Sequence, residues 1–300
     1  MLGKKRMHGY LRIACLLPLV SIVCFNLLMA KSQADSAAEK LFVLSEAMKP
    51  DDMDEVQRLL ESGANVNYVS KNGMTLLHVA SEKGYVEFAK LLLDAGAKVN
   101  AEETVGNTAL ILASQNGHKE VVKLLLDAKA KVNNRGFGGF NALILASEKG
   151  FDEVVKLLLD AKANVNSEGY GGFTALILAS QNGHKEVVKL LLDAGANADA
   201  ATGNNVTPLI LASQNGHTEV VKLLLDAGAN ANAKTKDDYT ALHMASNNGS
   251  IEIVKLLLDA GANIDTTFKK EGKQYTALDL AESRGNSGLI KLLKEYGAKN

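Results

Sequence analysis

Two glycine-rich stretches of the chain have residue types that could bind a phosphate group. Residues 134–142 read NRGFGGFNA, and residues 167–175, 33 positions later, read SEGYGGFTA. Glycines in front of a helix can let backbone amides converge on an anion. The known nucleotide-binding motifs also require features that are missing here. One motif needs a preceding strand and a final glycine, where this chain has Asn141 or Thr174, and another needs a Lys-Ser/Thr pair after the glycines. We therefore expect loops that hold no nucleotide.

The histidines raise a second chemistry, metal binding or catalysis. His118, His184 and His217 occupy equivalent Asn-Gly-His positions, 33 or 66 residues apart. One histidine per unit is no metal cage, and the sequence HKE at 118–120 lacks the second histidine of a zinc-protease helix. Catalytic groups are singular, whereas these residues recur. We predict that the protein is not an enzyme and has no metal or other cofactor.

Two pairs of charged residues are interpreted as ordinary solvent-facing helix pairs without catalytic meaning. They are Glu120 with Lys123 and Glu186 with Lys189.

An internal repeat supplies the elements that must position these residues. The sequence ILASQNGHKEVVKLLLDA begins at Ile111 and again at Ile177, with a near copy from Ile210. Eight units begin near residues 39, 72, 105, 138, 171, 204, 237 and 273. The predicted domains are a leader over 1–34 and one repeat domain over 35–300.

Each unit is predicted to be a pair of helices. Thr108 is a suitable N-cap for a short helix that ends near residues 116–117, where glycine permits a left-handed backbone. A second helix begins around His118, and its apolar arc is too wide for a single contact. Part of the arc must pack on the unit's own first helix and part on the next unit. The expected fold is an all-α solenoid in which no unit is stable alone.

The pattern resembles the ankyrin repeat, which has a 33-residue period and a T-P-L-H-x-A helix start. The matches are TLLHVA at 75–80 and the equivalent TALHMA at 240–245, together with DAGAN at 193–197, 226–230 and 259–263. Four units depart from the family histidine and carry Ile111, Ile144, Ile177 and Ile210. The resemblance implies loops that project as fingers between units, with fingers and first helices lining a concave face that binds a partner protein.

The aromatic residues are concentrated in these finger segments. Outside the leader the chain has 13 Phe and Tyr, and eight of them lie in fingers. Exposed aromatics on a rigid platform are typical binding anchors. Packing of neighbouring fingers on one another is the structural alternative. The predicted partner-binding residues are Phe137, Phe140, Tyr170, Phe173, Tyr239 and Tyr275, with Gln115, Gln181, Gln214 and Asn247 as polar neighbours.

Three local departures from the repeat give further expectations. Lys129 and Lys162 replace the glycine that ends the second helix elsewhere, which requires a left-handed lysine; drift after duplication and a functional patch are the two explanations. The last finger, residues 266–276, is three residues longer and basic, so we expect a second contact site. Polar residues at both ends suggest end units of a complete array.

The first thirty residues differ from the rest. A basic segment precedes the apolar run at 13–30, which is typical of a signal peptide cut after Ala30 or Ala34; an uncleaved membrane anchor is the alternative. Both cysteines, Cys15 and Cys24, lie in this leader. Removing residues 1–34 takes away five of the 33 basic residues and none of the 34 acidic ones, which leaves a net charge of −6. Such a chain is a poor candidate for binding nucleic acid.

The sequence thus predicts an exported, periplasmic or secreted monomer that binds another protein through its concave face. The alternative is a membrane-tethered spacer of the cell envelope without a specific ligand.

Overall fold

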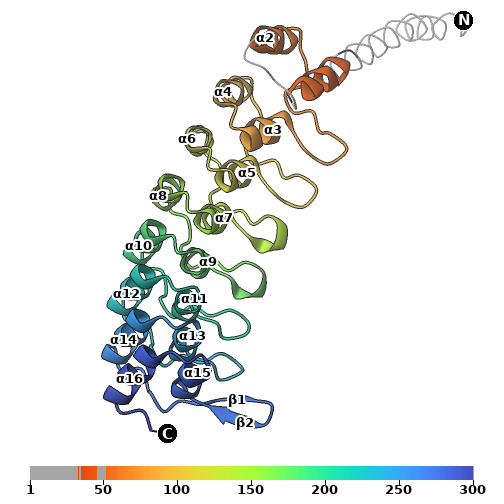
Figure 1. The fold of residues 1–300 in the computed structure, drawn as a ribbon. Helices are drawn as coiled ribbons and strands as arrows, with labels where there is room; N and C mark the ends of the chain where they lie inside the picture. The colour runs from red at the N-terminus through yellow and green to blue at the C-terminus, as the bar shows by residue number, and fades with distance from the viewer. Residues whose placement is uncertain (1–32, 34, 46–51, 300) are drawn as a thin grey trace, which may run out of the picture.

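The computed structural model describes residues 33, 35–45 and 52–299, and these residues form an all-α solenoid (Figure 1). The predicted leader, residues 1–34, lies outside the described residues apart from Gln33. In the part of the chain that the structure describes, no helix is long and apolar enough to cross a membrane.

Helix pairs stack along one curved axis, with the first helix of each pair on the inner side and the second on the outer side (Figure 1). After the helical residues 35–45, the helices are α2 (Met53–Glu61), α3 (Leu76–Lys83), α4 (Val86–Asp94), α5 (Ala109–Gln115), α6 (Lys119–Asp127), α7 (Ala142–Lys149), α8 (Asp152–Asp160), α9 (Ala175–Asn182), α10 (Lys185–Asp193), α11 (Pro208–Gln214), α12 (Thr218–Asp226), α13 (Ala241–Asn248), α14 (Ile251–Asp259), α15 (Ala277–Ser283) and α16 (Ser287–Glu295).

The first helices begin where the sequence predicts. The Thr108 side chain caps α5 by accepting a hydrogen bond from the Ile111 backbone N–H at 3.4 Å, and Asn141 caps α7 in the same way at 2.9 Å. Pro208 occupies the first turn of α11, where its missing N–H leaves no donor unpaired. The predicted helix starts are therefore confirmed.

The core runs without a break along the whole stack. Each second helix buries one face, as Val121, Val122 and Leu125 do in α6. The first helices α3 to α13 bury most of their residues, and α5 buries every residue from Ala109 to Ser114. At the end of the stack, α15 buries only Ala277, Leu278 and Ala281. Because each of the first helices α5 to α13 contacts the first helices of both neighbouring units, as α7 contacts α5 and α9, the apolar surface of one unit is covered by the next.

Polar side chains link successive units at fixed positions. The Asn100 Oδ1 atom accepts the Lys131 backbone N–H at 2.7 Å, and the same link recurs at Asn67, Asn133, Asn166, Asp199 and Asn232. The His118 Nε2 atom donates to the Glu82 carbonyl of the preceding unit at 2.9 Å, and His184 and His217 repeat this bond. The repeated histidines are thus used in stacking.

The ion pairs of the second helices α6 and α10 correct one sequence-based expectation. They join neighbouring units, Lys119 with Glu153 and Lys185 with Glu219, rather than the expected residues within one helix, Glu120 with Lys123 and Glu186 with Lys189. Stacking brings the outer helices side by side, so the carboxylate of the next unit becomes the nearer partner.

Both unusual lysines have the left-handed backbone expected from the sequence. The φ angles are 67° at Lys129 and 66° at Lys162, and both side chains are exposed. An added Cβ atom at the equivalent Gly195 would meet nothing within 4 Å, so the lysines have space and the penalty is conformational.

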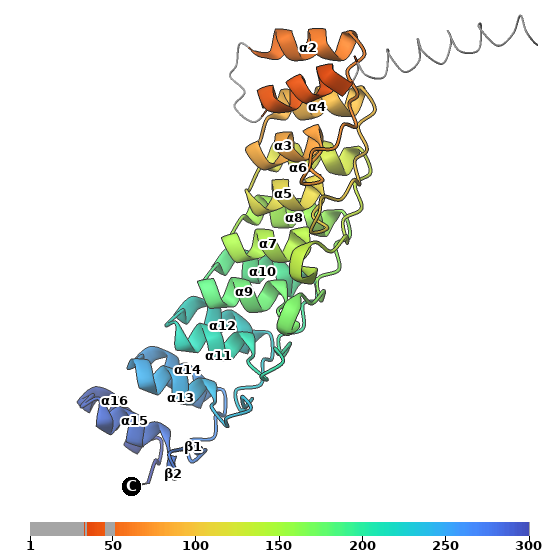
Figure 2. The same ribbon diagram turned by 90° about the vertical axis from the view of Figure 1, so that its right-hand side faces the viewer.

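The fingers project from the inner side of the solenoid, which Figure 2 shows from the direction of the fingers. Two of them contain short 3-10 turns, η2 (Phe137–Gly139) and η3 (Tyr170–Gly172). The last finger forms an antiparallel hairpin of β1 (Phe268–Lys270) and β2 (Lys273–Tyr275). The longer last finger expected from the sequence is therefore an ordered hairpin.

Candidate partner-binding site on the fingers

The two glycine-rich fingers are tight turns that hold an aromatic residue at the tip. In each, the first glycine donates its backbone N–H to the carbonyl of the second aromatic residue: Gly136 to Phe140 and Gly169 to Phe173, both at 2.8 Å. Gly138 and Gly171 have φ angles of 64° and 71°, which favour glycine. The tips stand clear of the protein, because Phe137 is 69% exposed and Tyr170 is 79% exposed.

The second aromatic residue of the first of these fingers packs on the protein. A Cβ atom added to Gly169 would lie 2.5 Å from the Phe140 ring, so the ring rests directly on this glycine. Phe140 is half-buried and also packs against the hydrophobic core. It therefore joins two neighbouring fingers.

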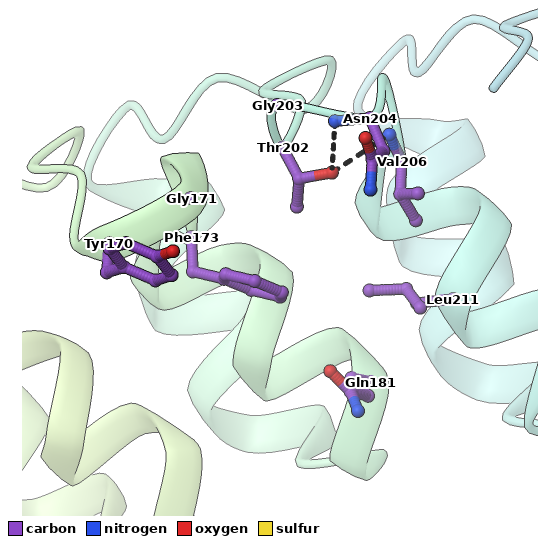
Figure 3. A pocket seen from close by; sticks show the side chains of 9 residues that line it. All are labelled: Tyr170, Gly171, Phe173, Gln181, Thr202, Gly203, Asn204, Val206 and Leu211. Atoms are coloured by element: carbon purple, nitrogen blue, oxygen red, sulfur yellow. Dashed lines mark hydrogen bonds between the residues drawn. The ribbon is translucent and has the colours of Figure 1, made fainter. Parts of the chain in front are cut away.

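Phe173, the equivalent of Phe140 in the next finger, has different surroundings, because another residue replaces the glycine on which Phe140 rests. Thr202, which is 33 positions after Gly169, is buried and has its own side chain. Its Oγ1 atom accepts the backbone N–H groups of Asn204 at 3.4 Å and Val206 at 3.2 Å, which fixes the turn of its finger. Phe173 is half-buried and lines an open groove (Figure 3).

This groove has a volume of about 520 Å³ and lies between two successive fingers (Figure 3). The fingers are joined at its edge by a hydrogen bond of 2.8 Å from the Gly203 backbone N–H to the Gly171 carbonyl. Its lining combines aromatic and aliphatic side chains with amide and hydroxyl groups. The lining residues are Tyr170, Gly171, Phe173, Gln181, Thr202, Gly203, Asn204, Val206 and Leu211.

Three of the sequence-predicted residues, Tyr170, Phe173 and Gln181, come together in this groove. The others lie along neighbouring units: Gln115 ends α5, Gln214 ends α11, and Asn247 in α13 accepts a hydrogen bond from Arg284 at 3.1 Å. Sequence reasoning missed Asn204, Val206 and Leu211, which belong to the following unit. The replacement of the finger glycine by Thr202 was the signal that could have indicated them.

Tyr239 and Tyr275 pack in a stack of rings at the far end of the finger row. The Phe268 ring, 3% exposed, lies with its centroid 4.2 Å from Tyr239 and 5.7 Å from Tyr275. His243 meets the same ring edge-on at 5.0 Å. These two tyrosines therefore also serve packing between fingers, the alternative that the sequence left open, and their part in binding stays a prediction.

The two family histidines, His78 and His243, are buried and hydrogen-bonded on both ring nitrogens. In His78, Nδ1 accepts the Thr75 backbone N–H at 3.0 Å, and Nε2 donates to the Ala101 carbonyl of the next finger at 3.0 Å. His243 repeats this arrangement with Thr240 and Thr266. Burial lowers the pKa of both imidazoles below the usual value, against the raising effect of the carbonyl bonds. The isoleucine units lack this titrating link between neighbours.

Metal binding is the other site chemistry to consider within residues 33, 35–45 and 52–299. No group of three or more His, Cys, Asp or Glu side chains there could hold a metal ion.

Comparison with known proteins agrees with the architecture. Residues 100–169, 161–235 and 209–300 match the family described as "Ankyrin repeats (3 copies)", and residues 44–93 match "Ankyrin repeats (many copies)". The protein is a stacked repeat protein, and it belongs to the ankyrin-repeat family. The fold class expected from the sequence is confirmed.

A solved structure titled "Crystal structure of human ASB11 ankyrin repeat domain" is similar to this chain. The sequences are 29% identical, the TM-score is 0.66, and the match covers 76% of this chain and 100% of the human one. No curated protein matches the sequence. Ankyrin repeats generally mediate protein–protein interactions as non-enzymatic scaffolds.

Proposed function

We propose that the protein is an exported, monomeric scaffold that binds a partner protein through its concave face and fingers. The observation that carries this proposal is Tyr170, 79% exposed at the tip of a hydrogen-bonded glycine turn and beside a groove lined by Phe173. A large aromatic residue on an ordered turn loses little conformational freedom on binding. Such a residue is a suitable anchor, worth about 2 kcal/mol or more when a partner buries it.

The groove is suited to an apolar side chain of an extended segment. Phe173, Val206 and Leu211 supply apolar contacts, while the Gln181 amide can hydrogen-bond to the segment's backbone. Phe137, on the preceding finger, provides a further exposed anchor. The partner would therefore lie across several fingers, with Gln115, Gln214 and Asn247 along the first helices beside it.

Photo-crosslinking in the source cell tests this surface. A p-benzoylphenylalanine residue replaces Tyr170 in one variant and Ile251 in the control, because Ile251 is an exposed apolar residue on the outer helix α14. We expect a discrete crosslinked protein from position 170 that position 251 does not give. Equal crosslinking from both positions would contradict binding through the fingers.

Export is the second part of the proposal and rests on the leader sequence. The mass of the protein isolated from culture medium and from envelope fractions locates the amino terminus. A cut after Ala30 or Ala34 supports an exported protein in the periplasm or outside the cell. An intact leader in the membrane fraction would support the tethered alternative.

A further inference from the structure

The hairpin of the last finger carries three exposed lysines. Lys269, Lys270 and Lys273 are all exposed, and Lys270 lies directly opposite Lys273 in the antiparallel register. Like charges directly opposite each other destabilise a strand pair. Strand alternation places Lys269 on the other face of the hairpin, so both faces are positive.

The lysines stand on an ordered base. Phe268, at the start of β1, is buried and stacks with the rings of Tyr239 and Tyr275. The His243 Nε2 atom donates to the Thr266 carbonyl at 2.8 Å and fixes the root of the finger. A binding partner would therefore meet a positive hairpin whose backbone is already positioned.

The neighbouring finger shows how charge is balanced elsewhere. There Lys234 pairs with Asp238 at 3.5 Å, within one finger. No carboxylate in the described part of the chain lies within ion-pair distance of the three hairpin lysines, Lys269, Lys270 and Lys273. Since the chain without its leader has a net charge of −6, the hairpin is a local positive site on an acidic protein.

We propose that this hairpin binds an acidic peptide segment whose carboxylates pair with Lys269, Lys270 and Lys273. The inference rests on the proposed function, because the segment belongs to the partner protein that the fingers hold. The hairpin continues the finger row on the same side of the solenoid (Figures 1 and 2), so one extended partner can reach both. Its apolar residues would meet the groove and its acidic residues the hairpin.

Nearby acidic residues favour a peptide over a nucleic acid or an anionic membrane. Asp237 and Asp238 lie on the adjoining finger, and Glu271 lies at the hairpin tip. Charges act over about 10 Å at moderate salt, and Glu271 lies between Lys270 and Lys273 in the sequence of the tip. A continuous polyanion would be repelled by these carboxylates, whereas a short peptide can present its carboxylates to the lysines alone.

The test is fluorescence anisotropy of a labelled peptide that alternates Glu and Ser, titrated with the purified protein. Lys269→Glu/Lys270→Glu/Lys273→Glu reverses the hairpin charge. The matched control, Lys156→Glu/Lys189→Glu/Lys222→Glu, makes the same net change at exposed lysines of the outer helices. We expect the hairpin variant to lose about tenfold in affinity and the control less than about twofold. Added salt should weaken wild-type binding.

Three outcomes would overturn the inference. Equal losses in both variants would mean that only net charge matters, and no binding to the wild type would mean that the hairpin does not recognise carboxylates. Tighter binding of phosphatidylserine vesicles or of single-stranded DNA through the same lysines would assign it another ligand. A Tyr170→Ser/Phe173→Ser variant tests the groove separately, so failure at the hairpin is distinguishable from failure of the proposed function.

Discussion

The two glycine-rich fingers have nearly the same sequence but different surroundings. In residues 134–141 the second aromatic, Phe140, rests on Gly169 and joins two fingers. In residues 167–174 the equivalent Phe173 has Thr202 in the position of that glycine and lines an open groove. The difference lies in the next unit, 33 residues along. In a repeat protein, therefore, the residue that leaves a groove open can lie in the unit after the loop that borders the groove.

Removing the second aromatic ring of each finger should give the largest difference in stability between the two fingers. Phe140→Ala should lower the free energy of unfolding by about 2 kcal/mol, since the ring is half-buried and a fully buried Phe costs about 3–5 kcal/mol. Phe173→Ala should cost less than half as much. Chemical denaturation monitored by circular dichroism measures both. Equal losses would mean that the two rings contribute alike to packing.

Filling the space under the packed ring should have the next largest effect. Gly169→Ala puts a methyl group 2.5 Å from the Phe140 ring and should destabilise the protein by about 1–3 kcal/mol. Gly203→Ala is the control, because its Cβ atom would meet only the Gly171 carbonyl oxygen at 3.7 Å. The control should change stability by less than about 0.5 kcal/mol. If both variants are neutral, the close contact described for Phe140 is wrong.

Acid should destabilise the histidine-containing units and spare the glycine-rich ones. His78 and His243 have folded-state pKa values below the unfolded value of about 6.5. Their contribution is therefore fully present above pH 6.5 and declines as the pH falls through 6.5 towards the folded pKa. Hydrogen exchange should show α3 and α13 opening at mildly acidic pH while α7 and α9, with Ile144 and Ile177, stay protected. In His78→Ile/His243→Ile, this part of the pH dependence should disappear.

The left-handed lysines should give the smallest effect, and a favourable one. Lys129→Gly and Lys162→Gly should each raise the free energy of unfolding by about 1 kcal/mol. Lys162→Ala removes the same charge but keeps the strained backbone, so it should give no gain. Thermal unfolding compares the variants, and a gain in the alanine control would show that the charge, not the backbone, is responsible.

The local features of each unit could be predicted from the sequence because they depend on neighbouring residues. The threonine caps, the helix starts and the left-handed lysines are of this kind. The expected pairing of Glu120 with Lys123 is wrong, and the sequence did not predict that Phe140 and Phe173 have different surroundings. Both depend on how one unit meets the next, which the order of residues within a unit does not state. The candidate site was therefore predicted only on the side supplied by Tyr170, Phe173 and Gln181.

The central claim is that the finger of residues 167–174, with the open groove beside it, binds a partner protein. Its most direct test is the affinity of the partner identified by crosslinking for the wild type, for Tyr170→Ser/Phe173→Ser, and for an Ile251→Ser control, under conditions where all three are folded. We predict a loss of at least about 100-fold in the double variant and none in the control. An unchanged affinity in the double variant would contradict the claim and move the binding surface away from this groove.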